Sequence, residues 1–283
     1  MAVKNIGVIG AGTMGAGIAQ VALMAGYEVM LLDINEEFVD KGAKGIANNI
    51  QKLVDKAKMS SEEAEAILAR LSKGTEYSVL RKADMVFEVI IENMNIKKEL
   101  YKQLDAICPA HTIFCTNTSG LSITEMGSVT RRADKVIGTH FFNPVPVMKL
   151  IEIIKGYDTS NETYTIAKSV CESFGKITIT VKEAPLFAVN RILVPMISEA
   201  ITVLEAGTAS AEDIDTGMKL GANHPIGPLA LADLIGLDVL LMVMDNLYTE
   251  TQDSKYRTPT LLRKLVRAGH YGRKTGKGFY SYN

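Results

Sequence analysis

The chain has little cysteine for its 283 residues. Its three cysteines, Cys108, Cys115 and Cys171, are an odd number, so at least one thiol is unpaired, and they lack the spacing of metal ligands. We therefore expect no metal site and a reduced protein with structural cysteines. Cys115 is the exception to test, because it lies beside the polar segment at residues 117–120.

A strong charge of one sign and long apolar runs are also missing. The net charge of −1 gives no field that would favour nucleic acid or an anionic membrane. No run of roughly 18 apolar residues is present to span a bilayer. Met1 lies almost directly before the first expected strand, which leaves no room for a signal peptide. We expect a cytoplasmic protein that binds neither nucleic acid nor membrane.

What the sequence does contain begins with a glycine-rich turn. Residues 4–10 are apolar and β-branched, typical of a buried parallel strand, and G-x-G-x-x-G follows at once. The first glycine permits the tight turn, the second lets a pyrophosphate approach, and the third lets the next helix, expected over 14–25, pack closely. The N-terminus of that helix favours phosphate. We predict a dinucleotide site at Gly10, Ala11, Gly12, Thr13, Met14 and Gly15.

An acid follows at the end of the second expected strand. Asp33 lies about 20 residues beyond the glycines, where a carboxylate accepts hydrogen bonds from the adenosine ribose hydroxyls. The same carboxylate repels a 2′-phosphate, and no arginine is present among the next few residues to hold one. The sequence therefore favours NAD as the cofactor over NADP.

Strand-like and helical segments alternate up to residue 184. Strands are expected at 28–32, 83–91, 112–116, 135–142, 149–154 and 177–181, and helices at 36–58, after the capping Ser60, at 96–107 and at 163–174. This alternation predicts a Rossmann-type α/β domain over residues 1–184, with a doubly wound, mostly parallel sheet that binds NAD.

The pattern changes near Ala184-Pro185. Helical segments without strands follow, at 190–205, at 210–220 with Ser210 as the cap, at 229–248 and at 259–268. We expect an all-α C-terminal domain over residues 185–283.

His140 and Glu152, twelve residues apart, are the candidate acid–base pair. Histidine can take a proton from an alcohol and return it near neutral pH, because its ordinary pKa is about 6.5. Glu152 lies in the apolar strand K-L-I-E-I-I, where a buried carboxylate needs a partner, and the imidazole of His140 would satisfy it. Two alternatives remain open: His140 as a core histidine, and Glu152 on an edge strand facing water.

Three polar residues lie at or just past the ends of expected strands: Glu92, Ser119 and His140. Ligands of a parallel sheet gather beyond the carboxyl ends of its strands. The dinucleotide turn together with His140 and Glu152 predicts hydride transfer to or from an alcohol.

Six segments together carry a resemblance to a known family. They are G-A-G-T-M-G-A-G-I-A-Q, N-T-S, H-F-F-N-P-V-P-V-M-K-L-I-E-I, N-R-I-L-V-P-M, D-I-D-x-x-M-K-L-G and G-K-G-F-Y. With them the chain resembles the short-chain L-3-hydroxyacyl-CoA dehydrogenase family over essentially its whole length. The resemblance implies an acyl-CoA thioester substrate, His140 as the base with Glu152 as its partner, and a homodimer formed through the C-terminal domain.

The resemblance also implies further site residues. Ser119 and Asn190 would bind the substrate oxygen near the nicotinamide. Besides the glycine turn and Asp33, cofactor contacts are implied for Glu92, Lys97, Ser119, Asn143 and Lys274. Contacts to coenzyme A are implied for Asn49, Lys52, Lys56 and Ser119.

The sequence departs from the family pattern in three places. Leu186 and Gly120 stand where the family has glycine and serine, and Cys115 stands where a smaller residue is common. A glycine at position 186 would serve close approach or an unusual dihedral. Three alternatives are open for Leu186: its backbone is strained, its side chain crowds the pocket near Asn190, or it packs with an ordinary dihedral.

Two other functions stay open on sequence alone. One is a two-domain β-hydroxyacid dehydrogenase, a class that relies on a lysine base, against which His140 and Glu152 argue. The other is a non-catalytic NAD-binding structural relative, which the departure at Leu186 leaves open.

Overall fold

The computed structural model describes residues 2–282 and divides into two compact units, residues 1–187 and 188–283. The sequence placed this boundary at residue 184. The first unit contains the whole β-sheet, and the second is helical.

The first unit is built on an eight-stranded sheet with the order β3-β2-β1-β4-β5-β6-β7-β8. Neighbouring strands run parallel except β6 and β7, which are antiparallel. The prediction of a mostly parallel sheet is therefore confirmed. The strands are β1 (Asn5–Ile9), β2 (Glu28–Leu32), β3 (Leu71–Gly74), β4 (Met85–Glu88), β5 (Ile113–Thr116), β6 (Val136–Phe141), β7 (Leu150–Lys155) and β8 (Ile177–Lys182).

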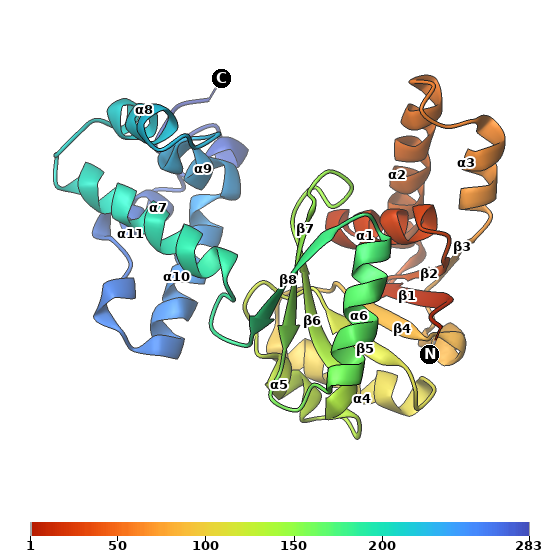
Figure 1. The fold of residues 1–283 in the computed structure, drawn as a ribbon. Coiled ribbons are helices and arrows are strands. Elements are labelled where there is room, and N and C mark those ends of the chain that lie inside the picture. The colour runs from red at the N-terminus through yellow and green to blue at the C-terminus, as the bar shows by residue number, and fades with distance from the viewer. Residues whose placement is uncertain (1, 283) are drawn as a thin grey trace. The chain divides into compact units, whose positions relative to one another are not determined.

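Helices cover both faces of the sheet (Figure 1). Side chains alternate along each strand, so Phe87 enters the core beneath α1, α2 and α6, while Val86 enters the opposite core beneath α4 and α5. The predicted doubly wound architecture is thus present. The helices are α1 (Thr13–Met24), α2 (Glu36–Asp55), α3 (Ser61–Leu68), α4 (Met94–Ile107), α5 (Ile123–Gly127) and α6 (Asn161–Ser173), with 3₁₀ helices η1 (Tyr77–Lys82) and η2 (Ala133–Lys135).

The order of the strands reverses at β1. From β1 the chain builds outward through β2 and β3, then returns to place β4 on the other side of β1. Such a reversal opens a crevice beyond the carboxyl ends of the strands. The glycine turn directly follows β1, so it lies at this crevice.

Among its described residues the second unit contains five α-helices and two 3₁₀ helices, and α9 and α10 differ from the prediction. The sequence suggested one apolar helix over 229–248, but Gly236 adopts a φ of 101° and separates two helices. The elements are α7 (Val189–Glu205), α8 (Ala211–Gly221), α9 (Pro228–Ile235), α10 (Leu237–Thr251), η3 (Ser254–Tyr256), α11 (Thr260–Arg267) and η4 (Arg273–Thr275). Within residues 2–282, no helix is long and apolar enough to cross a membrane.

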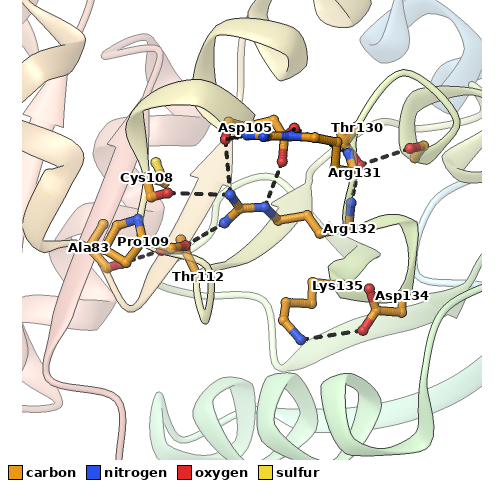
Figure 2. Close-up of polar contacts among 11 residues, drawn as sticks. Ala83, Asp105, Cys108, Pro109, Thr112, Thr130, Arg131, Arg132, Asp134 and Lys135 are labelled. Carbon is orange, nitrogen blue, oxygen red and sulfur yellow. Dashed lines mark hydrogen bonds and ion pairs between the residues drawn. The ribbon is translucent and has the colours of Figure 1, made fainter.

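The buried residues Asp105 and Arg132, together with the exposed Arg131, join the end of α4 to the segment after α5 (Figure 2). Arg132 donates from Nε to Asp105 Oδ1 at 2.7 Å, and Arg131 donates from Nε to Asp105 Oδ2 at 2.8 Å. Arg132 also lies over the ring of Phe114, 5.2 Å from its centroid. This cluster stabilises the face of the sheet that α4 and α5 cover.

Candidate active site

The glycine turn between β1 and α1 has the geometry that a dinucleotide requires. A Cβ atom on Gly10 would lie 2.4 Å from the carbonyl oxygen of Val89, and one on Gly15 would lie 1.7 Å from the carbonyl oxygen of Gly10. Only glycine fits at these two positions. A Cβ on Gly12 would meet nothing within 4 Å, and no side chain caps α1 there. This open approach to a helix N-terminus suits a pyrophosphate.

Asp33 lies beside that turn at the end of β2. Its Oδ2 accepts a hydrogen bond from the backbone N–H of Ala11 at 2.6 Å, and its Oδ1 accepts one from Ile34 at 2.7 Å. The carboxylate is half-buried and keeps further lone pairs for ribose hydroxyls.

A cleft of about 1830 Å³ runs along these elements in the first unit. It is large enough for a dinucleotide, since typical ligand pockets measure about 300–1,000 Å³. Predicted ligand-binding residues that line it are Gly10, Ala11, Gly12, Thr13, Asp33, Asn49 and Asn143.

His140 and Glu152 form a buried pair. The antiparallel register of β6 and β7 places the two residues directly opposite each other. His140 Nδ1 lies 2.7 Å from Glu152 Oε2, and the two residues are 5% and 0% exposed. A carboxylate only accepts, so Nδ1 donates and Nε2 remains for proton exchange. The predicted hydrogen bond is confirmed, and Glu152 does not face water.

Two phenylalanines flank the imidazole of His140. The ring centroid of Phe142 lies 4.6 Å away and that of Phe187 lies 5.8 Å away, both at tilted angles. Together with Glu152 they restrict the orientation of the ring.

Ser119 lies in an anchored loop after β5. Glu92 Oε1 accepts hydrogen bonds from the Ser119 backbone N–H at 2.8 Å and from Thr118 Oγ1 at 2.5 Å. Asn117 Oδ1 accepts from the N–H of Phe141 at 2.9 Å, which ties this loop to the strand of His140. The anchoring role of Asn117 was not predicted, although its place directly after a strand was a signal for it. Glu92 and Ser119, both expected at or just past strand ends, are thus in direct contact.

Lys97 lies in an almost fully buried ion pair. Its Nζ is 2.6 Å from Glu88 Oε1 and 3.5 Å from Glu92 Oε2, and the side chains of Lys97 and Glu88 are each 1% exposed. Such a pair leaves Glu88 without compensation when the lysine is lost. Lys97 thus reaches the Ser119 loop through Glu92, and its predicted contact with the cofactor stays a prediction.

The remaining predicted residues make other contacts. Lys52 and Lys56 are exposed at the C-terminal end of α2, and Asn49 on the same helix donates to Gln20 Oε1 at 3.0 Å. In the second unit, Asn190 is the second residue of α7, and Lys274 forms an ion pair with Asp238 at 2.5 Å.

The cysteines take no part in this chemistry. Cys115 is fully buried, and burial raises the pKa of its thiol well above the ordinary value, so it is neither exposed nor readily ionised. In the part of the chain that the structure describes, no group of histidine, cysteine and acidic residues could hold a metal ion.

The dinucleotide turn, the acid after β2 and the His–Glu pair at a strand end define a nucleotide-dependent oxidoreductase. Residues 5–184 match the NAD binding domain of 3-hydroxyacyl-CoA dehydrogenase, and residues 187–282 match its C-terminal domain. The chain therefore belongs to the 3-hydroxyacyl-CoA dehydrogenase family.

Individual relatives cover almost the whole chain. It is 50% identical over 279 residues to a 3-hydroxybutyryl-CoA dehydrogenase of Clostridioides difficile, covering 99% of both chains. It is 44% identical over 287 residues to the mitochondrial hydroxyacyl-coenzyme A dehydrogenase of Homo sapiens, covering 99% of this chain and 91% of that one. The crystal structure of an (S)-3-hydroxybutyryl-CoA dehydrogenase from Ralstonia eutropha matches all of both chains with a TM-score of 0.98 and 49% identity.

Proposed function

We propose that this protein interconverts short 3-hydroxyacyl-CoA and 3-ketoacyl-CoA thioesters with NAD(H), acting as a 3-hydroxybutyryl-CoA dehydrogenase. The natural pair would be 3-hydroxybutanoyl-CoA and acetoacetyl-CoA. The observation that carries the proposal is the buried contact of 2.7 Å between His140 and Glu152 at a strand end. Family membership and the relatives' names supply the substrate class.

His140 would move the proton of the reaction. In oxidation its Nε2 takes the hydroxyl proton, and in reduction it returns that proton to the ketone oxygen. Glu152 stabilises the imidazolium and holds the ring. Ser119 and Asn190 would donate to the same oxygen, at about 3 kcal/mol for each donor. When bound, NAD supplies the nicotinamide that accepts or returns the hydride at carbon 3.

The cofactor would lie along the glycine turn. The N-terminus of α1 would hold the pyrophosphate, and Asp33 would hold the adenosine ribose. Glu92, Lys97, Ser119, Asn143 and Lys274 are proposed as further contacts. The absence of a nearby arginine supports NAD over NADP.

Coenzyme A would bind along α2. Lys52 and Lys56 are exposed there, four residues apart and so on one face of the helix, where they can meet phosphates. Asn49 lies one turn earlier and lines the cleft, and Ser119 would contact the thioester end.

The substrate class supports a role in the metabolism of short acyl-CoA thioesters. We propose a cytoplasmic enzyme of fatty acid metabolism or of butyrate and butanol metabolism. Its active form would be a homodimer that pairs through the C-terminal domain.

Absorbance of the nicotinamide tests the proposal directly. Purified protein mixed with NADH and acetoacetyl-CoA should consume NADH, and NADPH should be the clearly poorer reductant. Asp33→Ser with Ile34→Arg should narrow or reverse this preference, because it removes the repulsion and adds a partner for the 2′-phosphate. Equal use of both cofactors by the unmodified protein would contradict the role of Asp33.

The two alternative functions give different results in the same assay. A β-hydroxyacid dehydrogenase would oxidise free hydroxyacids and ignore the CoA thioester. A non-catalytic relative would bind NADH and turn over neither substrate.

A further inference from the structure

The segment that ends the first unit has an unusual backbone. Leu186 and Phe187 both lie in the left-handed region, with φ of 62° and 59°. Non-glycine residues rarely adopt this conformation, and such strain tends to gather where structure serves a function. The strain expected at position 186 is confirmed, and the alternative of an ordinary dihedral is wrong.

Leu186 and Phe187 contact the surroundings of both Ser119 and His140. Phe187 lies against the imidazole of His140, 5.8 Å between centroids. Leu186 lies against Gly120, the residue after Ser119: a Cβ atom on Gly120 would be 3.0 Å from Leu186 Cδ2 and 4.0 Å from its Cα. Two successive residues therefore contact the proton-transferring residue and the loop of the proposed oxygen-binding serine.

Glycine at position 120 leaves space for Leu186 and does not serve an unusual dihedral. Gly120 is not one of the described glycines with a positive φ. The atoms nearest to the position of its missing Cβ all belong to Leu186. A contact of 3.0 Å is shorter than the optimal separation of about 3.5–4.0 Å for two carbon atoms, so Leu186 Cδ2 would have to move by a few tenths of an ångström. A leucine at position 186 thus fits because position 120 has no side chain.

The other side of the loop is fixed. Glu92 holds the N–H of Ser119, and Thr118 Oγ1 accepts from the N–H of Leu121 at 2.9 Å. These hydrogen bonds anchor the neighbours of Gly120, so a change of side-chain size at position 120 or 186 should displace Ser119 against that anchor.

We propose that Leu186 is a positioning residue whose side chain takes the space left by Gly120, and that this pair sets the place of Ser119 relative to His140. The inference rests on the proposed function of these two residues. It replaces the expectation that leucine merely crowds the pocket.

A double-mutant cycle tests the pairing. Gly120→Ala adds a methyl group that Leu186 must meet, and Leu186→Ala removes the atoms that meet it. Each alone should lower kcat by about tenfold or more with little change in KM for NADH, because a misplacement of about 1 Å can cost about a hundredfold. The double variant should recover to within about threefold of the unmodified protein, since residues in contact are non-additive.

Two further variants separate space from strain. Leu186→Gly relieves the dihedral but leaves the gap, so its kcat should fall as in Leu186→Ala. Leu186→Met keeps the volume and should stay near the unmodified rate. Gly217→Ala is the matched control, because a Cβ on Gly217 in α8 meets nothing within 4 Å.

The outcomes distinguish the inference from the proposed function. Inactivity of the unmodified protein with acetoacetyl-CoA would overturn the proposed function. An active protein with additive single effects, or a rise in kcat with Leu186→Gly, would overturn the positioning role. Thermal unfolding of all variants runs beside the kinetics, and a cycle that is non-additive in stability but additive in kcat would also overturn it.

Discussion

Glu152 illustrates how one residue fixes a site. A carboxylate in a strand with no exposed surface needs a charged or hydrogen-bonded partner, and His140 supplies it. The same contact determines which ring nitrogen carries a proton. The contact that satisfies the buried carboxylate is therefore also the one that orients the imidazole.

Substitution of either member should separate chemistry from cofactor binding. His140→Gln should lower turnover by roughly 10²–10⁴ while NADH binding stays nearly intact, because acid–base catalysis is lost. Glu152→Gln should also be slow, because the imidazolium loses its countercharge. Steady-state kinetics and NADH titration measure both effects.

Glu172→Gln is the control for these variants, since Glu172 is exposed on α6 and pairs only with surface groups. It should keep the normal rate. Near-normal turnover of His140→Gln would remove that residue from the mechanism, whatever the control shows.

Residue-scale strain also has a cost in stability. A left-handed conformation costs a non-glycine residue about 1–2 kcal/mol, and Leu186 and Phe187 adopt it in succession. Both side chains are buried, and that burial offsets the strain.

At the scale of the element, α4 depends on its buried aspartate. Asp105 accepts from Arg131 and Arg132, and the side chains of Asp105 and Arg132 are 8% and 10% exposed. Asp105→Asn would leave Arg132 as a poorly compensated buried charge, so the free energy of unfolding should fall by about 3 kcal/mol. Urea unfolding measures it.

The ion pair of the exposed Asp134 with the half-buried Lys135 provides the control (Figure 2). Asp134→Asn should change stability by less than about 1 kcal/mol, as is typical of surface pairs. Equal losses in the two variants would show that burial does not govern the Asp105 cluster.

The Asp105 cluster also predicts a pH dependence. Burial alone would raise the pKa of Asp105, but the hydrogen bonds from Arg131 and Arg132 outweigh it and hold the pKa below its ordinary value of 3.8. A lowered pKa in the folded state means that this stability is fully present above 3.8 and is lost as pH falls through the folded value. Asp105→Asn should therefore flatten the acid limb of the stability curve.

Strong local signals predicted most elements of the fold. These signals were the glycine motif of the turn, the capping residues Ser60 and Ser210, and the apolar runs of the strands. The strand β3 was not predicted, because its sequence L-S-K-G is an edge strand with exposed polar residues and no apolar alternation. The break at Gly236 was missed because the apolar residues on both sides continue one pattern.

The candidate site was predictable where a residue's chemistry demands a partner. The carboxylate of Glu152 in an apolar strand indicated His140 as a partner, although the sequence left a water-facing Glu152 open. Lys97 and Gly120 gave no such signal, because a lysine in a sequence is ordinarily exposed and a glycine ordinarily marks a flexible turn. Their partners, Glu88 and Leu186, are decided by packing between segments that the sequence does not place together.

At the scale of the whole molecule, the second unit leaves large apolar side chains exposed. Ile192 on α7 is 73% exposed and Leu220 on α8 is 83% exposed. Val239 and Met242 on α10 are 38% and 48% exposed, and their spacing puts them on one face of the helix. Single exposed apolar residues are common, but a shared face on α10 is a candidate contact for a second copy of the chain.

We expect the unmodified protein to sediment as a dimer at micromolar concentration. Val239→Asp with Met242→Asp should weaken association by at least about tenfold, because each aspartate would bury a charge without a partner. Tyr157→Asp is the control, since Tyr157 is 89% exposed in the first unit and should leave the dimer intact. A monomeric unmodified protein would refute the homodimer, and a dimer that survives the double substitution would place the interface on another surface. Because association stabilises only the folded chain, thermal unfolding should shift upward with protein concentration only where the α10 face is intact.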